Sequence, residues 1–166
     1  SEFLQQRIFG PLDMKDTAFK VNEGNKDRLT QLYKPEGVTA GNFFAPSTGD
    51  GLEVADAFVS AGYIYGSKFE SGGGGLIATA RDYLRFSQMM LNGGVLDGVR
   101  ILSPKTVDLM TTNHIGDLGL IFGRKGIGFG LDFAVVLNPG DVGEVSSAGE
   151  YNWGGAAGTR FWVDPQ

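Results

Sequence analysis

The tetrapeptide Trp153-Gly154-Gly155-Ala156 lies in a stretch that predicts a β-strand, and it is the segment best suited to chemistry. A pair of glycines inside a strand usually marks a bulge or a point where another group approaches the backbone closely. Beside a nucleophile, such a strand allows a substrate carbonyl to lie against it, and a backbone N–H such as that of Ala156 can donate to the developing oxyanion. One such donor contributes about 3 kcal/mol in acyl-transfer enzymes. The alternative interpretation is a packing bulge covered by Trp153.

The chain offers no recognisable nucleophile to accompany this strand. No serine lies in a Gly-x-Ser-x-Gly elbow, and none is followed by a lysine three residues later. Cysteine is absent, which excludes a thiol nucleophile, a disulfide and a cysteine-based zinc site. The single histidine, His114, excludes a multi-histidine metal centre, and its place at a predicted helix end favours a contact with helical carbonyls over a role as a base. We therefore expect neither a metal nor a cofactor.

A second glycine cluster, residues 71–75, reads Ser-Gly-Gly-Gly-Gly. It is not a phosphate loop, because no lysine follows Gly75, and it does not satisfy the dinucleotide-binding fingerprint. One interpretation is a tight turn that leads the chain into the next helix. The other is a backbone that passes unusually close to a ligand cleft, which only glycine permits.

The elements that position these segments follow from hydrophobic spacing and turn residues. Helices are predicted over residues 2–9, from Thr79 to Gly93-Gly94, and from Ser103-Pro104 to about residue 113. A short hairpin is predicted around Asp97-Gly98, a favoured turn dipeptide. Strands are predicted over residues 129–137, 151–156 and 160–163, with a turn at residues 138–141.

Helices followed by antiparallel strands indicate an α+β fold. We expect a single partial domain over residues 1–166, mainly helical and loop over 1–125 and formed by antiparallel strands with the Trp-Gly-Gly motif over 126–166. The last strand leads into Asp164-Pro165-Gln166, which reads as the start of a turn. We therefore expect the sheet to be incomplete, with a partner strand missing.

Composition excludes several classes of function. The chain has 166 residues, a mass of 17.7 kDa and 42% apolar residues, which excludes a disordered tail. A net charge of −5 argues against nucleic acid as a partner. No apolar run approaches the ~18 to 20 residues that span a bilayer, so no membrane span is expected. The absence of cysteine fits the cytoplasm and the periplasm equally well, so the localisation stays open.

Several segments together resemble the serine β-lactamase-related hydrolases, which include class C β-lactamases, DD-peptidases and family VIII carboxylesterases. Residues 3–17 (FLQQRIFGPLDMKDT) are similar to a segment of that family, although Asp13 stands where a glycine is expected. The other similar segments, in the same order along the chain, are residues 71–86 (SGGGGLIATARDYLRF), 91–94 (LNGG), 128–133 (GFGLDF) and 153–159 (WGGAAGT).

The resemblance implies a partial β-lactamase/DD-peptidase-like fold and assigns a role to residues 153–156. The third active-site motif of the family is Lys-Thr-Gly on an edge strand, and the esterase-like branch resembles Trp-Gly-Gly there. This places Trp153, Gly154 and Gly155 at the substrate and the backbone of Ala156 in the oxyanion hole. A tryptophan in place of the lysine removes a cation that would hold a substrate carboxylate, which favours esters over penicillins.

The same resemblance implies that important parts lie elsewhere. The family's nucleophile in Ser-x-x-Lys and its tyrosine motif both precede the segment matched by residues 3–17, and another strand and a helix follow the position of Asp164-Pro165. Tyr65-Gly66-Ser67 imitates the tyrosine motif at the wrong place in the chain order. We therefore expect a fragment of a serine hydrolase that is inactive alone. The intact enzyme is expected to act through an acyl-enzyme on a small-molecule ester, with a β-lactam as the alternative substrate.

One further expectation follows from missing neighbours of the Trp153 strand, and it concerns partners. Unpaired strand edges and exposed apolar surface favour a dimer, strand exchange or a companion N-terminal chain, and a monomer in light scattering would contradict this.

The alternative function is a non-catalytic binding or regulatory module that uses the glycine-lined groove without chemistry. A Ser-x-x-Lys motif upstream in the parent reading frame would eliminate that alternative.

Overall fold

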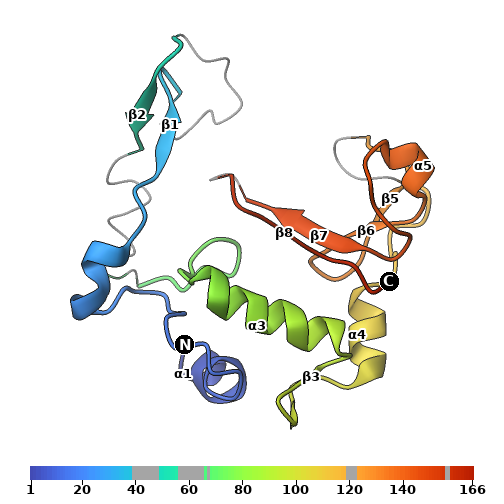
Figure 1. The fold of residues 1–166 in the computed structure, drawn as a ribbon, viewed down its shortest axis with the longest axis horizontal. Coiled ribbons are helices and arrows are strands. Elements are labelled where there is room, and N and C mark those ends of the chain that lie inside the picture. The colour runs from blue at the N-terminus through green and yellow to red at the C-terminus, as the bar shows by residue number, and fades with distance from the viewer. Residues whose placement is uncertain (39–48, 56–65, 67, 119–122, 156–157) are drawn as a thin grey trace. The chain divides into compact units, whose positions relative to one another are not determined.

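The computed structural model describes residues 1–38, 49–55, 66, 68–118, 123–155 and 158–166 (Figure 1). They form two compact units. Unit 1 consists of Ser1–Glu2 and Lys15–Thr79, and unit 2 of Phe3–Met14 and Ala80–Gln166. In the described residues no helix is long and apolar enough to cross a membrane. The single partial domain over residues 1–166 stays a prediction.

The chain begins with the helix that its apolar spacing predicts. Helix α1 (Glu2–Leu4) continues directly as a π-helix (Gln5–Phe9), and Phe9 is buried. The Gly10 N–H donates to the Gln5 carbonyl at 2.9 Å, five residues back, which is the π-helical spacing. The helix ends at Gly10 because Pro11 follows.

The described residues of unit 1 form three short regular elements. They are a 3-10 helix (Glu23–Arg28) and an antiparallel hairpin of β1 (Tyr33–Pro35) and β2 (Leu52–Val54). An isolated bridge joins Ala18 and Ile77.

The glycine run at residues 71–75 forms a turn, which confirms the first of its two interpretations. The Gly75 N–H donates to the Ser71 carbonyl at 3.0 Å. A Cβ on Gly75 would lie 2.6 Å from that same oxygen, so only glycine closes this turn. Whether the turn also approaches a ligand stays a prediction.

The first helix and hairpin of unit 2 follow the predicted pattern. Helix α3 (Ala80–Leu91) begins directly after Thr79. It ends with Gly93, in the left-handed region at φ 66°, and Gly94, whose N–H donates to the Met89 carbonyl at 2.9 Å. Strands β3 (Val95–Leu96) and β4 (Val99–Arg100) pair around Asp97-Gly98, whose φ values of 49° and 79° are those of a type I′ turn.

Helix α4 (Pro104–Met110) begins where the sequence predicts and ends about one turn early. Ser103 is its N-cap, because the Ser103 hydroxyl accepts from the Thr106 N–H at 3.1 Å, and Pro104 occupies the first helical position.

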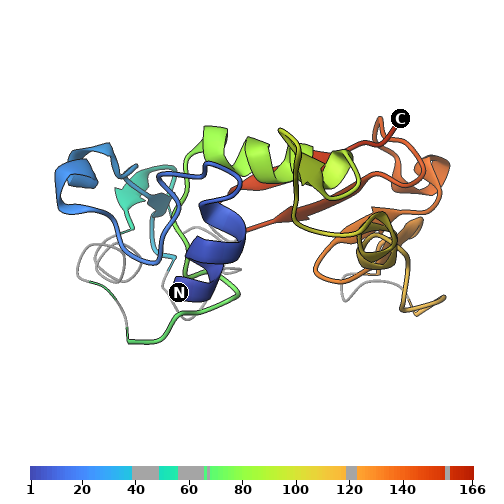
Figure 2. The same ribbon diagram turned by 90° about the horizontal axis from the view of Figure 1, so that it is seen from below.

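The remaining strands form one antiparallel sheet in the order β5-β6-β7-β8. Their bounds, with the short helix α5 between β6 and β7, are β5 (Ile127–Phe129), β6 (Ala134–Val136), α5 (Pro139–Val142), β7 (Tyr151–Gly154) and β8 (Arg160–Val163). Helix α3 packs on one face of this sheet (Figure 2). There the centroids of the Tyr83 and Phe161 rings lie 5.0 Å apart. The α+β class and the small open sheet are therefore confirmed.

The prediction of one strand over residues 129–137 is wrong, because a tight turn divides it into β5 and β6. The Gly130 N–H donates to the Phe133 carbonyl at 2.8 Å, and Asp132 is in the left-handed region at φ 68°. The apolar alternation of the sequence runs through this turn without a break. The predicted turn after the strand is instead the start of α5, with the Asn138 side chain accepting from the Gly140 N–H at 3.1 Å.

The core of unit 2 lies between the helices and the sheet. Its buried residues come from the first helix and the loop after it, from α3 and α4, and from the sheet: Phe9, Leu12, Met14, Met89, Met90, Val107, Phe133, Val135, Tyr151 and Val163. Leu12 and Met89 are completely inaccessible. Burying apolar side chains of this size stabilises the folded state by about 2 kcal/mol each.

Tyr151 carries a buried hydroxyl that has no hydrogen-bond partner among the described residues. Burial also raises the pKa of Tyr151 to about 12. Since the hydroxyl makes no bond that would be lost, Tyr151→Phe should raise the free energy of unfolding by about 1 kcal/mol at pH 8. Urea denaturation of the full-length protein measures this change, with the exposed Tyr33→Phe as a control. A loss of stability would show that the hydroxyl has a partner outside the described residues.

The same variant gives a pH dependence with a definite sign. The pKa of Tyr151 is higher in the folded state than the ordinary value of 10, so the folded state keeps the hydroxyl proton at a pH where the unfolded chain loses it. The free energy of unfolding therefore falls as the pH rises from 10 through about 12. Wild-type stability should therefore fall faster than that of Tyr151→Phe between pH 10 and 12. Equal slopes would contradict the burial effect.

Candidate active site

The Trp-Gly-Gly motif lies at the end of β7, where the strand has a neighbour on one side only. Trp153 and Gly154 pair with Phe161 and Arg160 of β8. On the other side, β6 pairs with β7 only at Tyr151 and Asn152. In the described part of the chain, β7 therefore extends past β6 and leaves an open edge at Trp153 and Gly154.

The backbone of Gly154 is directed at this open edge. Peptide groups along a strand alternate between its two neighbours. The Glu150 carbonyl accepts from the Val136 N–H of β6 at 2.8 Å, and the Gly155 N–H donates to the Thr159 carbonyl at 2.8 Å on the β8 side. Gly154 lies four residues after Glu150, an even number, so its N–H and C=O point to the same side as those of Glu150. They therefore point away from β8. The open edge thus presents main-chain hydrogen-bonding groups.

Gly155 supplies the close approach that paired glycines in a strand predict. A Cβ on Gly155 would lie 2.5 Å from the Thr159 hydroxyl oxygen. The Gly158 N–H donates to the Gly155 carbonyl at 3.0 Å, and Gly158 has a φ of 79°. At Gly154 an added Cβ would meet nothing closer than 3.6 Å. The close contact therefore lies at Gly155, where the Thr159 hydroxyl would have to rotate away from an added Cβ, and Gly154 leaves room beside the strand.

Ala156 lies outside the described residues, so its role as an oxyanion donor stays a prediction. Trp153 is 43% exposed. Its ring meets Phe129 of β5 edge to face, with centroids 5.2 Å apart and an interplanar angle of 70°. The two rings form an apolar wall at the end of the sheet.

His114 has the structural role that its position predicts. Its Nε2 lies 2.7 Å from the Leu109 carbonyl oxygen of α4, and because a carbonyl only accepts, the ring donates. Its backbone N–H donates to the Phe129 carbonyl at 2.8 Å. Both contacts connect the segment after α4, residues 111–116, to α4 itself and to β5, and we call this connection the α4–β5 joint.

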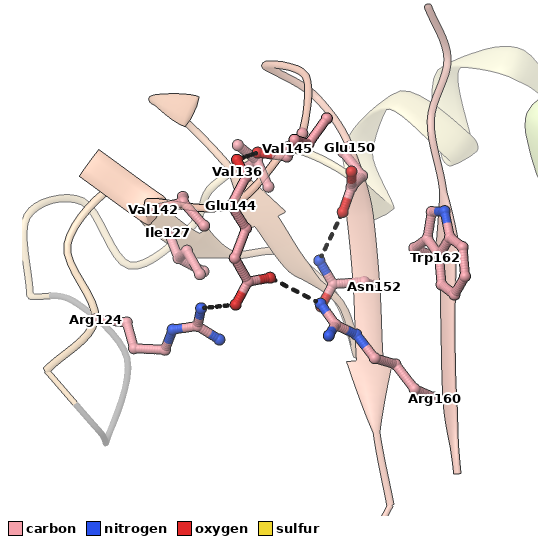
Figure 3. A pocket seen from close by; sticks show the side chains of 11 residues that line it. Arg124, Ile127, Val136, Val142, Glu144, Val145, Glu150, Asn152, Arg160 and Trp162 are labelled. Carbon is pink, nitrogen blue, oxygen red and sulfur yellow. Dashed lines mark hydrogen bonds and ion pairs between the residues drawn. The ribbon is translucent and has the colours of Figure 1, made fainter. Parts of the chain in front are cut away.

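The sheet also carries a cavity of about 270 Å³ that sequence reasoning missed (Figure 3). In it the Glu144 carboxylate lies between two guanidinium groups, 3.2 Å from Arg124 and 3.3 Å from Arg160. Hydrogen bonding from Arg160 and the charges of Arg124 and Arg160 lower the pKa of Glu144. Glu144 therefore stays ionised near neutral pH and is a weak base. No local signal connects these residues, because only strand pairing brings them together.

Metal ligands do not gather in the described parts of either unit: no group of three or more His, Cys, Asp or Glu side chains could hold an ion.

Comparison with known proteins identifies the family. The family model for β-lactamase matches residues 1–166. Protein Rv1367c of Mycobacterium tuberculosis (strain ATCC 25618 / H37Rv) is 32% identical over 174 residues, which cover 99% of this chain and 40% of that protein. The chain thus spans about two-fifths of the length of this curated relative.

Solved structures agree with this result. EstCE1, described as a hydrolase with promiscuous acyltransferase activity, has a TM-score of 0.78 and 25% identity over 99% of this chain and 42% of its own. The LovD6 mutant of simvastatin synthase from Aspergillus terreus shares the fold, with a TM-score of 0.76 and 20% identity over 99% of this chain and 41% of its own. Together with the match along all 166 residues, these likenesses show that the chain belongs to the β-lactamase family, among the serine β-lactamase-related hydrolases.

Proposed function

We propose that this chain forms the Trp-Gly-Gly side of the active site of a serine hydrolase that cleaves esters. The observation that carries the proposal is the open edge of β7, where the main chain of Gly154 points away from β8. A substrate carbonyl lies along this edge, Gly154 and Gly155 allow it to approach the backbone, and Trp153 contacts its apolar part. The likeness to EstCE1, a hydrolase, supports the choice of reaction.

The reaction proceeds through an acyl-enzyme. The serine of a Ser-x-x-Lys motif attacks the ester carbonyl, and the lysine and a tyrosine of the second motif move the protons. Negative charge develops on the carbonyl oxygen, and the N–H of Ala156 donates to it. The alcohol leaves, and water then releases the acid from the serine. Residues 1–166 supply the wall and one donor, so this chain alone is inactive.

Trp153 favours neutral esters over β-lactams. A lysine at this position would pair with the carboxylate of a penicillin, whereas an indole ring offers no cation and instead presents apolar surface. The half-exposed ring on Phe129 supports this choice, because it leaves an apolar face for an acyl or alcohol group.

The test is an assay of the full-length protein on p-nitrophenyl butyrate and nitrocefin. We expect turnover of the ester and at least tenfold lower kcat/KM for the β-lactam, since burial of an ion without its partner is costly. The matched control is alanine in place of the serine of Ser-x-x-Lys, which should abolish turnover. Absence of turnover on both substrates would overturn the proposal and favour a non-catalytic binding module.

A further inference from the structure

Asn113 connects the end of α4 to the outer edge of β5. Its Oδ1 accepts from the N–H groups of Phe129 and Ile115, both at 3.1 Å, and its Nδ2 donates to the Gly116 carbonyl at 3.0 Å. The His114 N–H donates to the Phe129 carbonyl at 2.8 Å. Both main-chain groups of Phe129 are therefore held by the short segment that follows α4.

Two glycines of β5 and the turn after it make this joint possible. A Cβ on Gly128 would lie 2.5 Å from both Cγ and Oδ1 of Asn113. A Cβ on Gly130 would overlap the Met110 carbonyl oxygen, which accepts from the Leu131 N–H at 2.8 Å. Asn113 therefore lies directly on the backbone of β5, in a space that no side chain at Gly128 could share.

The joint holds the residue that supports Trp153. Phe129 is the last residue of β5, and its ring meets the Trp153 ring at 5.2 Å. Trp153 lies beyond the part of β7 that pairs with β6, so strand pairing supports it from the β8 side only. The Phe129 ring is therefore a contact that reaches Trp153 from outside its pairing with β8.

We propose that Asn113 is a positioning residue that holds Phe129 and, through it, orients Trp153 as the wall against which the acyl chain of an ester packs. The part that concerns the substrate rests on the proposed function. Asn113 itself touches no reacting atom. Its side chain fixes the main chain of Phe129, and an edge-to-face pair of rings transmits that position to the site.

The first test follows Trp153 directly and needs no activity. The full-length protein is labelled with 5-fluorotryptophan, and the Trp153 resonance is assigned by its loss in Trp153→Phe. We expect Asn113→Ala to shift this ¹⁹F resonance as Phe129→Ala does. Asn113→Asp keeps an oxygen acceptor for the Phe129 N–H but loses the donor to the Gly116 carbonyl, so it should shift the resonance less than Asn113→Ala does. Asn92→Ala is the matched control, because Asn92 follows α3 as Asn113 follows α4, and its side-chain oxygen accepts from the Gln88 side chain at 2.9 Å.

The second test measures ester selectivity. The ratio of kcat/KM for p-nitrophenyl butyrate to that for p-nitrophenyl acetate should fall about three- to tenfold in Asn113→Ala, mainly through KM for the butyrate. Asn113→Ala combined with Phe129→Ala should give no further change beyond Phe129→Ala, because Asn113 acts through Phe129. If Asn113 had a purely structural role, Asn113→Ala would lower kcat/KM equally for both substrates and leave the ratio unchanged.

The outcomes separate the two proposals. A Trp153 resonance that stays in place in folded Asn113→Ala or moves equally in Asn113→Asp would overturn the positioning role. A shifted resonance with an unchanged selectivity ratio would overturn the assignment of Trp153 as the acyl wall. If the wild-type protein hydrolyses no ester but the Trp153 resonance still shifts in Asn113→Ala, the proposed function fails and the positioning of Trp153 stands.

Discussion

Replacing Ala156 with proline in the full-length protein should lower kcat for p-nitrophenyl butyrate about 100-fold. Proline has no N–H, so this substitution removes the one group of Ala156 that the proposed mechanism uses. Loss of one oxyanion-hole donor costs on the order of 100- to 1,000-fold in kcat. The residue before a proline must be extended, and Gly155 meets this requirement more easily than other residues because it has no Cβ.

Ala156→Ser is the matched control, because it keeps the backbone N–H and adds only a hydroxyl. We expect its kcat to stay within about threefold of wild type, and circular dichroism should show that both variants are folded. KM should change less than kcat in Ala156→Pro, since the donor acts mainly on charge that develops in the transition state. Near wild-type turnover in a folded Ala156→Pro protein would remove Ala156 from the oxyanion hole.

Replacing Gly130 with alanine should destabilise the fold by about 3 kcal/mol, the upper part of the range for overpacking. The added Cβ would overlap the Met110 carbonyl oxygen and lie 3.1 Å from the Thr112 carbonyl oxygen. Both obstacles are backbone atoms at the end of α4, so no side chain can rotate away. The joint that holds β5 would have to open.

Gly154→Ala is the control for stability within the same sheet. Its Cβ would meet nothing closer than the Thr159 carbonyl oxygen at 3.6 Å, an ordinary contact distance. Urea denaturation of the full-length protein should show Gly154→Ala within about 0.5 kcal/mol of wild type. Equal stability of the Gly130 and Gly154 variants would contradict the close packing of α4 against the turn between β5 and β6.

Local signals predicted the elements whose ends are fixed by their own residues. Ser103-Pro104 specifies the start of α4, Asp97-Gly98 the turn of the β3–β4 hairpin, and Gly93-Gly94 the end of α3. The sequence prediction of a strand over residues 160–163 matches β8.

The failure at residues 129–137 has a tertiary cause. Alternating apolar residues predict one strand, but Gly130 approaches the end of α4 and Asp132 adopts a left-handed conformation. All three residues of β6 are buried, so this strand does not alternate between buried and exposed residues as a half-exposed strand does. A contact between segments that are distant in sequence decides the turn.

In the candidate site too, some residues could be identified from local sequence and others depend on tertiary contacts. Trp153, Gly154 and Gly155 could be identified from the sequence, because paired glycines in a strand are unusual and the motif resembles that of a known family. Asn113 and Glu144 could not, since each acquires its partners only when the strands pair.

Covalent labelling of the full-length protein with a fluorophosphonate tests the central claim most directly. Peptide mass spectrometry would locate the modified residue. We expect one adduct, on the serine of a Ser-x-x-Lys motif outside residues 1–166, and at least tenfold slower labelling in Ala156→Pro. No adduct, or an adduct on a serine within residues 1–166, would contradict the account.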